Sequence, residues 1–105
     1  MGISRRIFDT SISSPVAEVS DKLVEFSTDT SGTPTGDVGI IVNRGSSDNV
    51  FLGWDESEDK VVAATTTATG DSDGDLTLTP TAFSAGDITV NGGDLSFGNG
   101  QNATA

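Results

Sequence analysis

The chain has 105 residues, with 16 acidic residues against five Lys and Arg, no His and no Cys. Without Cys and His it has no disulfide, no thiolate nucleophile, no Ser–His–Asp triad and no metal site built on either residue. A formal net charge of −11 argues against binding to nucleic acid or to anionic lipid, since both need a basic protein surface. We also expect no membrane insertion, because no apolar run of about 18 residues occurs, and no secretory signal.

The first twenty residues are predicted to form an irregular arm. It holds Arg5 and Arg6, the only basic cluster, either as a tether to an acidic partner or as part of a flexible arm. Whether residues 15–26 form a helix or a strand stays open. The helix is indicated by Pro15 and by a stripe of apolar residues at helical spacing: Val16, Val19, Leu23 and Phe26. We favour a strand over residues 22–27, followed by a loop up to residue 36.

The clearest prediction is an antiparallel meander of three strands. The predicted strands cover residues 38–42, 50–54 and 60–65. Val38, Ile40 and Val42 alternate against Ile41, and Val50, Leu52 and Trp54 alternate against Phe51, which is the period of a strand. A loop rich in turn residues joins the first two strands, and an acidic turn joins the second to the third. Strands with two apolar faces suit a sheet that lies between layers or between subunits.

Two further β elements are predicted after the meander. Residues 75–79 alternate cleanly, and Pro80 is expected to end that strand. Residues 87–90 and 94–97 flank Asn91-Gly92-Gly93, which predicts a hairpin because Asn-Gly readily adopts the positive φ angles of a primed turn.

The whole pattern predicts an all-β chain, with an antiparallel meander and hairpins in a sandwich- or prism-like arrangement. We divide it into an N-terminal arm (1–20), a β-rich domain (21–97) and a flexible C-terminal tail (98–105).

Two acidic stretches are weak candidates for chemistry. Asp71, Asp73 and Asp75 stand at alternate positions, as carboxylates that hold Ca²⁺ often do. The EF-hand pattern fails, however, since Leu76 stands where it requires glycine, and we favour a solvated turn. The turn over residues 55–59 lacks the aromatic cleft of a glycosidase. We therefore expect no catalytic residue, no cofactor and no enzyme activity.

Assembly with other copies is the stronger prediction. Val, Ile, Leu and Phe make up only about a quarter of the chain, so a lone copy is expected to bury too little apolar surface. Trp54 is either an interface side chain, which we favour, or a platform for stacking sugars. Arg44 is expected to pair with a carboxylate of its own chain or of a neighbouring subunit. The candidate interface residues are Trp54, Phe51, Val50, Leu52, Ile41 and Arg44.

Residues 37–60, DVGIIVNRGSSDNVFLGWDESEDK, continue into VVAATTT. They resemble a segment of virion structural and tail-fibre proteins of marine bacteriophages, notably those that infect cyanobacteria. The strings RGS, FLGWDES and DK carry the resemblance, which extends over about residues 22–79. It implies a non-catalytic, β-rich virion component, made in the host cytoplasm and assembled as a homotrimer with other virion proteins. It brings no catalytic or binding residues.

Fibre proteins are usually far longer than this chain. A tail fibre or fibre-associated protein is therefore the favoured function, and a capsid decoration protein remains an alternative. A small carbohydrate-binding β-module that adheres to a host-surface glycan is the other alternative.

Overall fold

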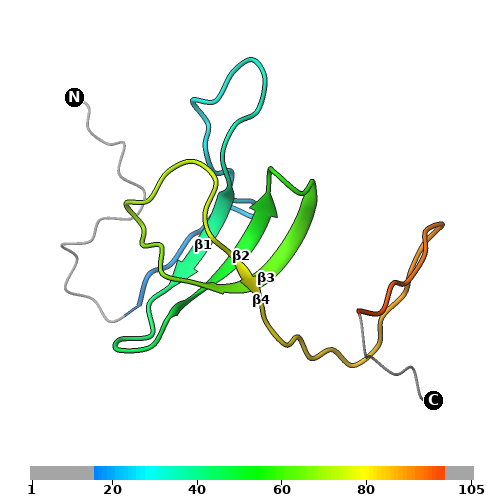
Figure 1. Ribbon diagram of the computed structural model, residues 1–105. Helices are drawn as coiled ribbons and strands as arrows, with labels where there is room; N and C mark the ends of the chain where they lie inside the picture. Colours follow the sequence, from blue (N-terminus) through cyan, green and yellow to red (C-terminus); the bar gives the residue numbers. More distant parts are fainter. Residues whose placement is uncertain (1–15, 99–105) are drawn as a thin grey trace, which may run out of the picture. The chain divides into compact units, whose positions relative to one another are not determined.

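A four-stranded antiparallel sheet is the regular structure of this computed structural model, which describes residues 16–98 (Figure 1). The strands pair in chain order: β1 (Val38–Val42), β2 (Asn49–Asp55), β3 (Lys60–Thr66) and β4 (Thr79–Pro80). Residues 16–98 include no helix, and hence none that could cross a bilayer. The chain divides into two units between Thr33 and Pro34, and the sheet belongs to the second.

The predicted meander is confirmed, and its register separates the apolar side chains into two faces. Ile41 lies opposite Phe51, and Phe51 lies opposite Ala64. Directly opposed residues of antiparallel strands project to the same side of a sheet. One side, the covered face, carries Ile41, Asn49, Phe51, Asp55, Lys60, Val62, Ala64 and Thr66. The other side, the open face, carries Val38, Ile40, Val42, Val50, Leu52, Trp54, Val61, Ala63 and Thr65.

Phe51 is the centre of the covered face. It is 2% exposed, and it and Ala64 are the only buried hydrophobic residues of the described chain. Its ring lies over Gly39 and Gly53, which are directly opposite each other in β1 and β2. A Cβ built on either glycine would stand within 2.9 Å of a ring carbon of Phe51. The two glycines therefore provide the space that the ring occupies.

The loop over residues 67–78 is fastened to the covered face by hydrogen bonds (Figure 1). Asn49 Nδ2 donates to the carbonyl oxygen of Ala68 at 2.9 Å. Thr66 Oγ1 donates to the carbonyl oxygen of Thr77 at 2.8 Å. Leu76 and Leu78 in this loop are half-buried, so the loop is the layer that covers this side of the sheet.

Asp37, just before β1, ties this loop to the turn between β2 and β3. Its Oδ1 accepts a hydrogen bond from the Glu56 N–H, and its Oδ2 accepts one from the Leu76 N–H, both at 2.9 Å. Its own N–H donates to the carbonyl oxygen of Gly74 at 2.9 Å. One carboxylate thus holds together three segments that are distant in the sequence.

Replacing Asp37 with asparagine is expected to lower the free energy of unfolding by about 2 kcal/mol, since hydrogen bonds to charged groups contribute about 1.5–3 kcal/mol each. A carboxamide has one acceptor oxygen, so its NH₂ group would face one of the two backbone donors. Urea unfolding followed by the fluorescence of Trp54, the single Trp, measures the change. Asp48→Asn is the matched control, because the Asp48 carboxylate makes no hydrogen bond within the described residues. Equal losses in the two variants would contradict the role of Asp37.

The prediction of a strand over residues 22–27 is wrong, and so is the alternative prediction of a helix. Residues 16–33 hold neither helix nor strand, and their backbone has one turn, in which the Thr30 N–H donates to the Ser27 carbonyl oxygen at 3.1 Å. Leu23 is 87% exposed. No strand of the described chain pairs with this segment, and a strand without a neighbour is not stable in water. Arg5 and Arg6, like residues 99–105, lie outside the described residues.

The prediction of a strand over residues 75–79 is also largely wrong, since β4 begins only at Thr79. The Leu76 N–H and the Thr77 carbonyl oxygen bond to side chains of Asp37 and Thr66 instead of to a strand. The alternation in this stretch reflects the partial burial of its leucines. Pro80, expected to end the strand, is part of β4, where its missing N–H is tolerated because β4 is an edge strand.

The hairpin expected over residues 87–97 forms its bend but no strands. The chain bends at Gly92 and Gly93, with a φ of 76° at Gly92. Residues 84–98 contain no strand. The described part of a single chain therefore has one sheet, without the second sheet that a sandwich or a prism requires.

Candidate assembly surface

The open face of the sheet is the candidate functional site because it is apolar and accessible. Leu52 at its centre and Trp54 at one end are 44% and 38% exposed, and Val61 is 78% exposed. Ile40 and Val42 extend this surface onto β1, where both are nearly half exposed. Contiguous apolar surface of this kind marks sites of interaction in folded proteins.

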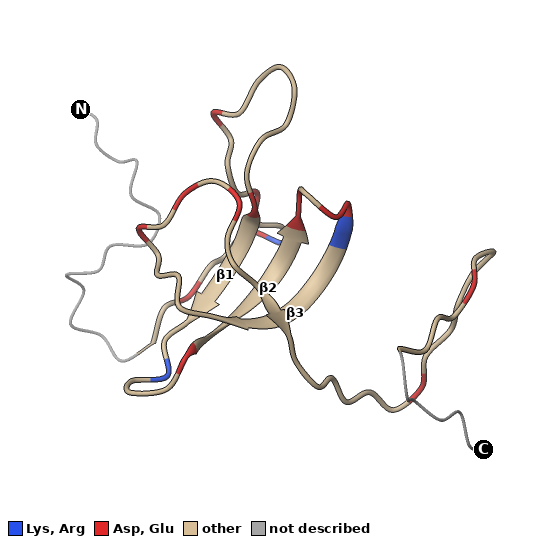
Figure 2. Cartoon of the chain, in the orientation of Figure 1, with Lys and Arg blue, Asp and Glu red and all other residues tan. Residues whose placement is uncertain are grey.

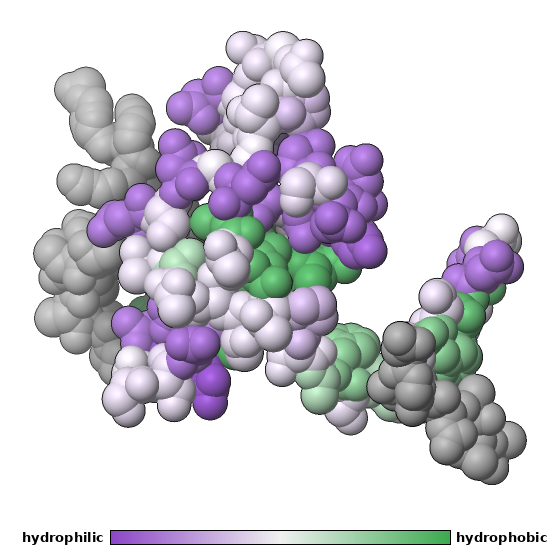
Figure 3. All heavy atoms as spheres, in the orientation of Figure 1, coloured by the Kyte–Doolittle hydropathy of each residue, from purple (hydrophilic) through white to green (hydrophobic). Residues whose placement is uncertain are grey.

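Charged side chains lie around the sheet rather than within it. Figure 2 shows the acidic residues in the loops and at the ends of the strands, while the strands themselves are mostly uncharged. Figure 3 shows apolar surface over the sheet between hydrophilic loops, and again along the segment after β4. None of the open-face residues defined above is charged. A partner recognised by ionic contacts would therefore find no counter-charge on this face.

Trp54 is held at one end of the open face. Its indole Nε1–H donates to Glu56 Oε1 at 3.0 Å. Its neighbours on the face are aliphatic, with Val38 and Val61 directly opposite it on β1 and β3. The indole nitrogen is therefore engaged, and the ring presents apolar surface.

The other predicted interface residues are divided between the two faces. Val50 and Leu52 lie on the open face with Trp54, whereas Ile41 and Phe51 lie on the covered face and pack inside the chain. The expected ion pair of Arg44 within its own chain does not form in the described residues. Its guanidinium Nη1 donates instead to the Asp48 carbonyl oxygen at 3.0 Å. As interface residues of an assembly, all six remain a prediction.

The register adds residues that were not among the predicted interface residues. Ile40, Val42 and Val61 belong to the open face, and Asp55 opposes Lys60 across the β2–β3 turn. The four residues 56–59 form the turn between β2 and β3, and this turn length sets the register that places Val61 beside Trp54. The length of the acidic turn was therefore the signal in the sequence that could have identified Val61.

A shallow apolar groove runs along β2 and β3, with a volume of about 300 Å³. Leu52, Val61 and Ala63 line it from the open face, Gly53 and Val62 also contribute to it, and Phe83 lines it from the segment after β4. No charged side chain lines it. The groove therefore suits an apolar side chain of a partner.

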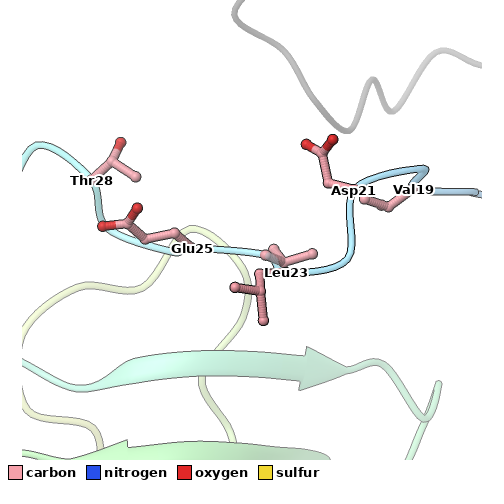
Figure 4. Close-up of a pocket in the computed structure, with 6 residues that line it drawn as sticks. Val19, Asp21, Leu23, Glu25 and Thr28 are labelled. Atoms are coloured by element: carbon pink, nitrogen blue, oxygen red, sulfur yellow. The ribbon is translucent and has the colours of Figure 1, made fainter.

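A second hollow lies along residues 19–28, in the first unit. Figure 4 shows its lining side chains spread along one extended segment, with the carboxylates of Asp21 and Glu25 at separate places. Every lining residue is exposed. This hollow has no buried polar group to orient a ligand, so it lacks the features of a binding site.

The acidic candidates do not converge on a common point. The described residues contain no group of three or more acidic side chains arranged to hold a metal ion, so calcium binding by Asp71, Asp73 and Asp75 gains no support. Asp73 Oδ1 accepts a hydrogen bond from the Gly74 N–H at 2.9 Å. Asp55 is 9% exposed, and its Oδ1 accepts bonds from the Ser57 hydroxyl and the Glu58 N–H. These carboxylates shape turns.

Comparisons with protein-family models, with curated proteins and with solved structures find no match for this chain. The structural part of the argument for a function therefore depends on the chemistry of the open face.

Proposed function

We propose that this chain is a non-catalytic structural subunit of a bacteriophage virion, a tail fibre or fibre-associated protein, that assembles with copies of itself through the open face. The supporting observation is the contrast between the two sides of the sheet. Phe51 and Ala64 are buried on the covered face, while five large apolar side chains of the open face are 38–78% exposed: Ile40, Val42, Leu52, Trp54 and Val61. An antiparallel sheet with one side in water normally has polar residues there, so an apolar open face needs a second layer.

Charge favours the open face as the place where copies meet. Chains of net charge −11 repel one another wherever their acidic loops approach. The open face carries no charged side chain, so copies joined there do not bring carboxylates together. The acidic loops then remain in solvent on the outside of the assembly.

The virion role rests on the resemblance of residues 37–60 to segments of phage tail-fibre proteins, which also implies a trimer. A capsid decoration protein would use the same face for assembly. The carbohydrate-binding alternative has weaker support, because the indole N–H of Trp54 is already engaged by Glu56 and its neighbours on the face offer no hydrogen bond to a sugar hydroxyl.

The solution mass of the protein tests this proposal. Light scattering at micromolar concentration is expected to give the mass of three chains of 10.7 kDa. Leu52→Glu places a charge in the open face and is expected to yield monomers, because an unpaired charge is costly to bury. Leu23→Glu, at an 87% exposed site in the other unit, is expected to leave the mass unchanged. A wild-type monomer at this concentration would overturn the assembly, and absence of the chain's peptides from purified phage particles would overturn the virion role.

A further inference from the structure

The segment after β4 carries a second set of exposed apolar side chains. We refer to residues 83–97 as the tail segment. Its large apolar residues are 43–73% exposed: Phe83, Ile88, Val90, Leu95 and Phe97. All residues from 79 to 98 are exposed. The tail segment of one chain therefore leaves its own apolar surface without a cover.

The tail segment has the pattern of an amphipathic hairpin. Figure 1 shows the chain doubling back at its orange-to-red end, and the bend is at Gly92 and Gly93. The φ of 76° at Gly92 is in the range that primed two-residue turns require.

A two-residue turn at this bend places all the apolar residues of the hairpin on one side. Val90 then lies opposite Leu95, and Ile88 lies opposite Phe97, because opposed residues share a side. The other side is polar: Asp87, Thr89, Asp94 and Ser96. An isolated two-stranded hairpin is marginal in water and needs a surface to pack on.

We propose that in the assembled protein the tail segment of one copy forms this hairpin and packs its apolar side on the open face of a neighbouring copy. The inference rests on the proposed function, and it identifies the part of the neighbour that supplies the second layer.

The size of the open face favours this arrangement over a simple contact between two open faces. Three strands about 4.8 Å apart and five residues of about 3.3 Å each make a face of roughly 14 by 17 Å. A specific interface buries about 800 Å² from each partner, which is several times the flat area of that face. If each copy packs its tail segment on one neighbour and accepts the tail segment of another copy on its own open face, the surface of the tail segment is added to the area buried at each contact.

Charge and chain path agree with the same arrangement. The open face and the apolar side of the hairpin are both uncharged, and Asp87 and Asp94 on the outer side remain in water. Phe83 forms a wall of the groove on the open face. The tail segment therefore leaves its own sheet on the side at which copies meet.

Engineered cysteines test the contact directly, because the natural chain has none. Chains with Leu52→Cys and chains with Val90→Cys, one of them carrying a mass tag, are mixed in urea, refolded together and oxidised. A disulfide between the two kinds of chain is expected, because the proposed contact brings the tail segment of one copy against the open face of another. The bond reports that contact, since two cysteines form a disulfide only when their Cα atoms approach within about 7 Å. Ser46→Cys replaces Leu52→Cys in the control, because Ser46 is exposed in the β1–β2 loop, away from the open face.

Each outcome has a defined meaning. An oligomer of the expected mass in which Leu52→Cys links to Val90→Cys no better than the Ser46→Cys control would overturn the tail contact and leave the proposed assembly standing. A chain carrying both Leu52→Cys and Val90→Cys that links only within itself would show that the tail covers its own sheet. That result would overturn the exchange. A monomeric wild type would contradict both proposals.

A pair of adjacent substitutions provides a second readout. Ile88→Asp places a charge on the apolar side of the hairpin and is expected to raise the dissociation constant of the assembly by at least about tenfold. Thr89→Asp adds the same charge on the opposite, outward side and is expected to leave the constant within about twofold. Equal effects of the two substitutions would overturn the predicted orientation of the hairpin.

Discussion

Replacing Phe51 with alanine is expected to lower the free energy of unfolding by about 4 kcal/mol, in the range of 3–5 kcal/mol found for buried aromatic residues. Phe51 is the one large side chain among the described residues that is almost fully buried, so no second core side chain compensates for the cavity. Domains of this size have only about 5–15 kcal/mol of stability in total. Urea unfolding at fixed protein concentration, followed by circular dichroism, measures the loss.

Phe26→Ala is the matched control for Phe51→Ala. Phe26 is 47% exposed and lies in the unit without the sheet, so its truncation is expected to change stability by less than about 0.5 kcal/mol. Similar losses in the two variants would contradict the assignment of the core to the covered face.

Adding a single methyl group at Gly53 is expected to lower the free energy of unfolding by about 3 kcal/mol, the upper part of the range for overpacking. A Cβ at Gly53 would clash with the carbonyl oxygen of Val38, its nearest neighbour, and would stand 2.6 Å from the Gly39 Cα and 2.8 Å from Cζ of the Phe51 ring. The β1–β2 pairing holds the two backbone neighbours and the packed core holds the ring, so none of them moves away easily. The midpoint of urea unfolding of Gly53→Ala measures the loss.

Two comparisons identify the cause of the Gly53→Ala loss. Gly86→Ala, at a position where a Cβ would meet nothing within 4 Å, is expected to be neutral or slightly stabilising. In a Phe51→Leu background the cost of Gly53→Ala is expected to fall, because part of the clash is with the aromatic ring. An unchanged cost in that background would assign the whole effect to the backbone of β1.

The meander was predictable from sequence because its signals are local. Alternation along residues 38–42 and 50–54 assigns the strands, and the acidic turn fixes the register between β2 and β3. The open face follows from the same parity, but the sequence shows two apolar faces and does not say which of them the chain covers. Phe51 and Ile41 were therefore grouped with Leu52 and Trp54 as interface residues.

What decides between the faces is a set of contacts between distant residues. Asp37 reaches the Glu56 and Leu76 N–H groups, which are 19 and 39 residues away along the chain. An aspartate before a strand is a common turn residue, so its sequence position does not indicate this role. The same contacts explain why residues 75–78 form a covering loop, although their alternation is typical of a strand.

In the tail segment, the sequence pattern predicts two strands that the structure of a single chain lacks. The segment's alternation and its Asn91-Gly92-Gly93 sequence predict a hairpin, and the bend is present at Gly92 and Gly93. The strands are absent because a pair of strands gains little until its apolar side meets another surface. The pattern describes the segment as it would be on such a surface.

The order of the strands has a consequence for how the molecule reaches its final state. Each of the first three strands pairs with its neighbour in the chain across a short connection, so little loop-closure entropy opposes the pairing and the meander is expected to form rapidly. The proposed joining of copies would be a bimolecular step whose rate depends on concentration. Under that proposal, encounters between subunits rather than the folding of any one of them would limit maturation, and a rise in expression level would speed it.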